Sequence, residues 1–188
     1  MLFRSFLAEQ APTPYRKALL SLQARLDSAR RGEATPEIGG EEITRTSALA
    51  LGQRVSDFVV ADLTGKESAR LARLLGKPVL VFFYNPATAT GADVLRFTLD
   101  LHQRHGGRLG FMAMAVTNDA GLARKQHADM KLPFPILDGQ GMRLTFGVDA
   151  TPRFALLDGE GILRYASTGW GAHTPHEITA EVGRCLAK

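Results

Sequence analysis

The 188-residue sequence predicts an α/β domain, with a mixed β-sheet flanked by helices and an N-terminal helical extension in front of it. Residues 79–83 and 109–116 are continuous apolar runs, the pattern of strands buried on both faces. Residues 154–158 and 162–166 flank a Gly-Glu-Gly turn, which is the signal of a β-hairpin. Parallel crossovers followed by an antiparallel pair make the sheet mixed.

The first 48 residues differ in texture from the rest of the chain. Thr13-Pro14 is typical of a helix start, and an apolar stripe continues this helix to about residue 31. Residues 32–46 are polar and rich in Gly, Glu and Thr, which is typical of a linker. We therefore expect residues 1–48 to form an N-terminal helix and linker, and residues 49–188 to form the domain.

Within the domain, apolar spacing and turn residues predict the order of the elements. They are a strand at 58–62, a turn at 63–66, a helix at 68–75, the buried strand at 79–83, a helix at 93–105, the second buried strand at 109–116, a helix at 118–130, an extended piece at 134–138, a helical turn at 141–146, the hairpin, and a last helix from residue 174.

Charge and hydropathy argue against two classes of partner. The chain has 23 Lys and Arg against 19 Asp and Glu, and the basic residues are scattered, with Arg30-Arg31 as the only doublet. Nucleic acids and anionic membranes are bound by concentrated basic patches, so we expect neither partner. No stretch is apolar enough to span a membrane, and no signal peptide is visible. Compartment and oligomeric state stay open.

Cys185 is the only cysteine, which excludes an intramolecular disulfide, a CxxC motif and a Cys-rich zinc site. It lies beside Val182 and Leu186 in the predicted last helix, so we expect a small buried hydrophobe rather than a redox centre. His173 and His176 have no evident third ligand, and no Walker or dinucleotide motif is present. We therefore predict neither a metal nor a cofactor.

The turn after the central strand is where α/β proteins place their chemistry, because helix N–H groups and the positive dipole end meet there. Here Asn85-Pro86 ends the strand, and residues 87–92 contain no cysteine, histidine or lysine. Thr88 and Thr90 fit the role of helix caps better than that of nucleophiles. Thr90-x-x-Asp93 matches a variant capping box.

Three segments resemble a known family. Leu51-Gly-Gln-Arg-Val-Ser-Asp-Phe58 resembles the "G-x-x-x-P-D-F" start of redoxin domains, and Asp62-Leu-Thr-Gly-Lys66 resembles their first hairpin. Residues 147–161 resemble "Y-G-V-x-x-T-P-x-x-F-L-I-D-x-x-G". The chain thus resembles the redoxin superfamily over residues 49–188, and the resemblance implies a thioredoxin fold in which Pro152 is a cis-proline facing the active site.

The resemblance also implies redox chemistry for which this chain lacks the sulfur. In the register of ResA/TlpA-type thiol-disulfide oxidoreductases, CxxC falls on Thr88-Ala-Thr-Gly91, and a hydroxyl cannot form a disulfide. In the register of AhpC/TSA peroxiredoxins, Asp93 replaces the peroxidatic cysteine. The activating arginine of that family would align near Pro152 and is missing, since the adjacent Arg153 would point to the other face of a strand. The Thr151-Pro152 pair favours the thiol-disulfide branch. The degenerate positions are therefore Thr88, Gly91 and Asp93.

We expect a redoxin-like domain that has lost thiol redox activity and acts as a protein- or peptide-binding or structural module. The alternative is a thiol-disulfide oxidoreductase or peroxiredoxin-like enzyme that works with partner thiols or Cys185. A third hypothesis has the Thr-rich helix N-terminus bind a small anion. The residues expected to line the groove are Pro86, Thr88, Thr90, Thr151, Pro152 and Trp170. Trp170 fits either a groove wall or a plug at the edge of the core.

Overall fold

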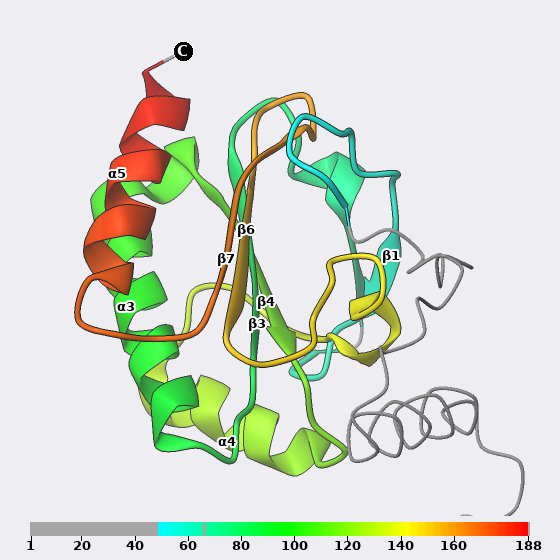
Figure 1. The fold of residues 1–188 in the computed structure, drawn as a ribbon. Coiled ribbons are helices and arrows are strands. Elements are labelled where there is room, and N and C mark those ends of the chain that lie inside the picture. The colour runs from blue at the N-terminus through cyan, green and yellow to red at the C-terminus, as the bar shows by residue number, and fades with distance from the viewer. Residues whose placement is uncertain (1–48, 66, 188) are drawn as a thin grey trace, which may run out of the picture. The chain divides into compact units, whose positions relative to one another are not determined.

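The computed structural model describes residues 49–65 and 67–187, and its centre is a five-stranded sheet of order β5-β4-β3-β6-β7 (Figure 1). The strands are β3 (Val79–Tyr84), β4 (Gly110–Ala115), β5 (Ile136–Asp138), β6 (Arg153–Leu157) and β7 (Leu163–Thr168). β4 runs parallel to β3 and β5, whereas β6 runs antiparallel to β3 and β7. The predicted mixed sheet is confirmed.

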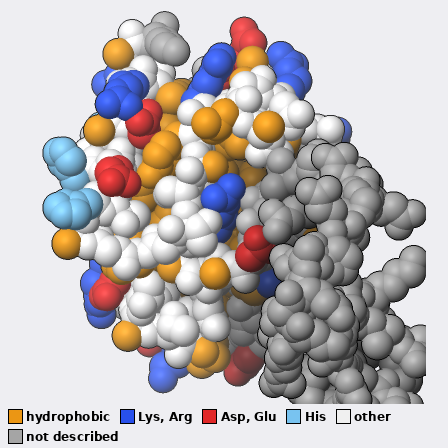
Figure 2. Space-filling view, viewed as in Figure 1, with side chains coloured by type: hydrophobic (Ala, Val, Ile, Leu, Met, Phe, Trp, Pro, Cys, Tyr) orange, Lys and Arg blue, Asp and Glu red, His pale blue; other side chains and the backbone are white. Residues whose placement is uncertain are grey.

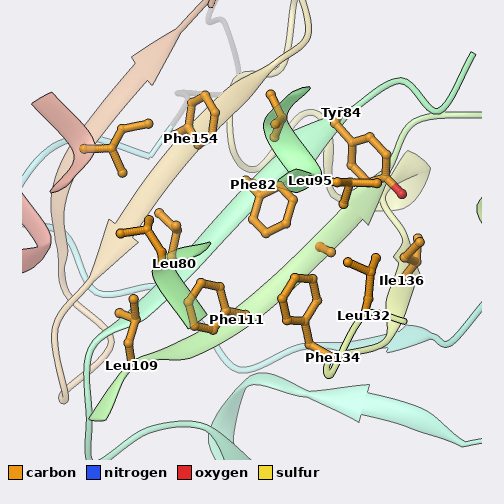
Figure 3. Close-up of a cluster of buried hydrophobic side chains, with 14 of the residues drawn as sticks. Leu80, Phe82, Tyr84, Leu95, Leu109, Phe111, Leu132, Phe134, Ile136 and Phe154 are labelled. Atoms are coloured by element: carbon orange, nitrogen blue, oxygen red, sulfur yellow. The ribbon is translucent and has the colours of Figure 1, made fainter. Parts of the chain in front are cut away.

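β3 is the middle strand, and all six of its residues are buried. Because side chains alternate along a strand, Leu80, Phe82 and Tyr84 enter one hydrophobic cluster, and Val79, Val81 and Phe83 enter another. In the first cluster the Phe82 ring lies near those of Phe134 and Phe154, at centroid distances of 6.3 and 6.4 Å (Figure 3). The apolar run therefore forms a strand that is buried on both faces.

The α-helices cover the face of the sheet that carries Leu80 and Phe82. They are α3 (Ala89–His105), α4 (Ala120–Met130) and α5 (Thr174–Leu186), and each contributes buried residues to the first cluster. Figure 1 shows α3 and α5 side by side on this face, with β1 (Val59–Ala61) on the other side of the sheet. The second face is covered by short elements that supply Val60, Leu71 and Phe146.

The predicted helix at 68–75 is wrong. Ser68–Arg70 forms strand β2, which pairs antiparallel with β1, and Leu71–Arg73 is a single 3-10 turn, η1. The spacing of the leucines suggested a helix, but a window of eight residues is too short to outweigh strand pairing. Leu71 is fully buried, and its N–H donates to Phe58 O at 3.1 Å, which fixes the position of η1 relative to the paired strands β1 and β2.

Other element boundaries differ by a few residues from those predicted. α3 begins at Ala89 rather than at residue 93, and the expected helical turn at 141–146 is the shorter 3-10 turn η3 (Gln140–Met142). A further 3-10 turn, η2 (Gly106–Arg108), follows α3. Within the described ranges no helix is both long and apolar enough to cross a membrane. The N-terminal helix and the domain boundary at residue 48 lie outside the described residues and stay predictions.

Candidate functional site

The turn between β3 and α3 is held by Asn85 and Thr88. The Asn85 side-chain Oδ1 accepts from the N–H of Ala87 at 2.9 Å, and its backbone oxygen accepts from the Thr88 hydroxyl at 2.9 Å. Thr88 has extended φ and ψ of −109° and 149°, and its Oγ1 accepts from the N–H of Gly91 at 3.0 Å. Thr88 is therefore the N-cap of α3, as the sequence predicted.

The capping box predicted for Thr90 and Asp93 is wrong. Because Thr88 caps the helix, Thr90 already lies in the first turn, and the position that a capping box would use is Gly91. Asp93 is exposed and pairs with Arg96 one turn further on, at 2.7 Å. An exposed pair of this kind contributes about 0.3–0.5 kcal/mol to stability, so Asp93 has an ordinary surface role.

Gly91 stands where the CxxC register would require the second thiol. A Cβ built on Gly91 would lie 2.1 Å from the backbone oxygen of Asn85, 3.0 Å from its carbonyl carbon and 3.2 Å from Thr88 Oγ1. The nearest of these atoms is backbone and cannot move aside cheaply. The turn after β3 is thus built for glycine at this position, in addition to lacking sulfur.

The Thr151-Pro152 loop lies beside this turn. The antiparallel pairing of β3 with β6 ends at Phe83 and Arg153, so the turn that follows β3 and the loop that precedes β6 lie at the same end of the sheet. The Thr151–Pro152 peptide bond is cis, and Pro152 is buried while Thr151 is half-buried. The two loops that the sequence analysis singled out therefore meet at one end of the sheet.

The backbone polar groups of this loop are unequally satisfied. Pro152 O accepts from the N–H of Gly169 at 2.8 Å. By contrast, neither the N–H nor the C=O of Thr151 has a hydrogen-bond partner within the part of the chain that the structure describes. Thr151 is the residue directly before Pro152, at the end of the sheet where α3 begins. Among the described residues it therefore offers one donor and one acceptor without partners at this end of the sheet.

Trp170 lies at the edge of the core. Its ring contacts Phe97 of α3 and Phe154 of β6, at centroid distances of 5.5 and 5.9 Å, and it packs against the first cluster. Of the two roles left open by the sequence, these contacts support the core plug. The bond from Gly169 to Pro152 keeps the residue close to the Thr151-Pro152 loop all the same.

Two polar residues near the turn carry no signal in the sequence. Gln126 of α4 donates from Nε2 to Pro86 O at 2.9 Å and so ties α4 to the turn, while its buried Oε1 has no partner among the described residues. The buried hydroxyl of Tyr84 also has no partner in this part of the chain, and burial raises the pKa of Tyr84 above its ordinary value of 10.0. Neither position follows a motif, since both depend on how α4 packs on β3.

Cys185 lies at the other end of the sheet. It is half-buried and lines a groove of about 820 Å³ together with residues that precede β3 and residues of the β6–β7 turn, Pro78 and Asp158 among them. Six residues of β3 separate Pro78 from Asn85, a span of about 20 Å. The single thiol is therefore remote from Thr88 and Gly91. Among the described residues, no group of three or more His, Cys, Asp or Glu is placed to hold a metal.

The charged side chains do not gather at the site. On the face drawn in Figure 2, basic and acidic residues of the described chain are interspersed rather than collected into one broad field. Several acids of the described residues form local pairs with arginines, such as Asp57 with Arg70 at 2.5 Å and Asp158 with Arg164 at 2.7 Å.

Comparison with known proteins identifies the fold. No family model and no curated protein matches the sequence. Solved structures similar to this chain include the following three. A proposed thiol:disulfide interchange protein DsbE of Chlorobium tepidum has 20% identity and a TM-score of 0.67, over 74% of this chain and 99% of its own. A proposed protein disulfide isomerase of Bacteroides thetaiotaomicron has 13% identity and a TM-score of 0.64, over 74% and 92%.

The third similar structure is a secreted disulfide oxidoreductase of Mycobacterium tuberculosis, with 18% identity and a TM-score of 0.58 over 68% of this chain and 95% of its own. The chain therefore has the thioredoxin-like fold that its resemblance to the redoxin superfamily implied. At these identities the likeness establishes the fold alone. The single cysteine of this chain is consistent with loss of the thiol pair.

Proposed function

We propose that this chain is a thioredoxin-fold module that binds an extended peptide segment of another protein at the Thr151-Pro152 loop and carries out no thiol chemistry there. The observation that carries the proposal is that the N–H and C=O of Thr151, at the end of the sheet where α3 begins, have no hydrogen-bond partner among the described residues. An extended peptide can satisfy both groups by adding a short strand, which is a common mode of peptide recognition.

The neighbouring surface suits such a guest. Pro152 is buried and anchors the loop, while Thr88 and Ala89 are exposed on the turn that lies opposite. The groove is thus bordered by two fixed backbone segments, one held by the Thr88 cap and the other by the bond from Gly169 to Pro152. Rigid borders reduce the entropy lost on binding, so a peptide can bind there without a covalent step.

The absence of thiol chemistry has two supports. Thr88 replaces the nucleophilic thiol, and Gly91 leaves no room for the second side chain. Cys185 lies at the opposite end of the sheet and cannot act together with the turn after β3. The three similar proteins are described as thiol:disulfide enzymes, and we infer that this chain keeps their scaffold without that reaction.

The binding proposal is tested by selecting peptides from a displayed random nonapeptide library on the full chain and measuring their affinity by fluorescence anisotropy. Ala89→Trp places a large side chain at the exposed start of α3 and should weaken binding at least tenfold. Ala180→Trp is the matched control, since Ala180 is also an exposed helical alanine but lies on α5. Equal affinity in both variants would place the binding site elsewhere.

The alternative, an enzyme that uses Cys185 or a partner's thiols, is tested by dithiol-dependent insulin reduction and by peroxide consumption. We expect turnover no higher than the background of the reductant alone, for the wild type and for Cys185→Ser alike. Turnover that depends on Cys185 would overturn the assignment of a non-catalytic module, and turnover that survives Cys185→Ser would point to partner thiols.

A further inference from the structure

Arg143 and Arg153 differ from every other arginine among the described residues. They are the ones that are half-buried, whereas the rest are exposed. Exposed arginines such as Arg70 and Arg164 pair with aspartates, but neither Arg143 nor Arg153 forms an ion pair within the described ranges. A charge that has lost part of its hydration usually has a counter-ion, so two without one favour an anionic guest.

Both guanidinium groups are fixed by neutral acceptors, which lie on the loop before Thr151 and, for Arg153, also on β7. Arg153 donates from Nε to Phe146 O at 3.3 Å and from Nη1 to Thr168 Oγ1 at 2.9 Å. Arg143 donates from Nε and Nη2 to Val148 O at 3.4 and 3.3 Å. A guanidinium carries five N–H donors, so each arginine keeps donors for a further acceptor. The two guanidinium groups are thus held in place before any ligand binds, and their neutral acceptors leave the positive charge of each uncompensated.

Arg153 adjoins the Thr151-Pro152 loop in the chain, and its side chain lies on the face of the sheet that carries the second cluster, because its neighbour Phe154 belongs to the first cluster. Arg143 is bonded to Val148 O, on the loop that leads to Thr151. Arg153 follows Thr151 by two residues, so its Cα lies within about 7 Å of the free backbone groups. A peptide strand that pairs with Thr151 would carry its neighbouring side chains within reach of Arg153. Asp149 is the acid of this segment, but it is exposed and forms no ion pair among the described residues.

We propose that the groove selects peptides that carry an aspartate or glutamate next to the segment paired with Thr151, with Arg153 and Arg143 receiving the carboxylate. This inference rests on the proposed peptide-binding function and names the chemistry of its partner. Arginine suits the role because its planar fork binds a carboxylate through two parallel hydrogen bonds.

The test compares selected peptides on defined variants of the full chain. Nonapeptides selected from a random displayed library should be enriched in Asp and Glu. For a synthetic peptide from that set, replacing Glu by Gln should weaken binding to the wild type about 5- to 20-fold in 150 mM salt. The same replacement should have less than a twofold effect on Arg153→Gln, while Arg153→Lys should keep part of the preference.

Arg108→Gln is the matched control, because Arg108 also lacks an ion pair, donates to a backbone carbonyl at 3.4 Å, and lies before β4 at the far end of the sheet. It should leave the preference unchanged. Thermal melting of each variant separates loss of the fold from loss of selectivity. Selected peptides without an acidic preference, or a preference that survives Arg143→Gln/Arg153→Gln, would overturn this inference alone. Selection of no peptide would overturn the proposed function with it.

Discussion

Replacing Gly91 by alanine puts a methyl group where the turn after β3 has no room. The new Cβ would lie 2.1 Å from Asn85 O, more than 1 Å inside ordinary contact, so the turn or the first turn of α3 must move. Overpacking of this kind costs about 1–3 kcal/mol of unfolding free energy. Helix propensity alone would act in the opposite direction, since alanine is favoured over glycine by up to about 1 kcal/mol.

Whether Gly91→Ala lowers or raises the free energy of unfolding therefore shows whether overpacking or helix propensity is the larger effect. We expect Gly91→Ala to lose about 2 kcal/mol, which lowers Tm by about 6 °C. The control is Gly183→Ala in α5, where a Cβ would meet no atom within 4 Å, so helix propensity acts without opposition. That variant should gain up to about 1 kcal/mol. Urea unfolding followed by circular dichroism measures both. Stabilisation of both variants would refute the claim that the turn after β3 has no room for a side chain at residue 91.

The same clash bears on the chemistry that the fold could regain. Thr88→Cys/Gly91→Cys restores the CxxC pattern in the register of the thiol-disulfide oxidoreductases, but the second cysteine needs the Cβ that the turn excludes. We expect this variant to be destabilised and to show insulin reduction at the level of the reductant alone. Efficient turnover would show that the turn adapts to a side chain at this position.

The remaining predictions concern the cap, the hairpin and the core edge. Thr88→Ala should cost about 1 kcal/mol in urea unfolding, with most of it recovered in Thr88→Ser, because the hydroxyl bond to the N–H of Gly91 is lost and then restored. Burial alone would raise the pKa of Asp158, but bonds from the N–H groups of Ile162 and Glu160 and from the Arg164 guanidinium outweigh it and lower that pKa below 3.8. A carboxyl whose folded pKa is depressed stabilises the protein above its unfolded pKa, so this stability should disappear as pH falls below about 4. Asp158→Asn should show a flatter acid limb in unfolding measured from pH 6 to 3, and an unchanged acid limb would contradict the assignment. Trp170→Ala should lower the free energy of unfolding in urea by about 2 kcal/mol, because Trp170 packs on two aromatic rings. An unchanged free energy of unfolding would instead favour a role for Trp170 as a groove wall.

Periodicity and turn residues predicted the strands of the sheet well, because β3 and β4 are buried on both faces and their apolar runs are unambiguous. They failed at residues 68–75, where the segment with three leucines at helical spacing forms a short strand and then a 3-10 turn that begins at Leu71. Pairing with β1 decides the strand, and partners such as Val59 and Arg70 leave no trace in local spacing.

The candidate site was predicted in part. Thr88 and Thr151-Pro152 follow from local sequence patterns, and the structure brings their loops together. The steric role of Gly91 depends on the path of the Asn85 carbonyl, and the lack of an ion pair for Arg153 among the described residues depends on the paths of several loops. Such features arise only once the chain has folded, so no motif could have revealed them.

Amide hydrogen exchange read out residue by residue by NMR, with and without a selected peptide, tests the peptide-binding function most directly. A peptide that adds a strand to the Thr151-Pro152 loop must accept the N–H of Thr151, so exchange of this amide should slow at least tenfold on binding. Protection should be unchanged around Cys185. Unaltered exchange at Thr151 in the saturated complex, or new protection confined to the groove beside Cys185, would contradict binding at this site.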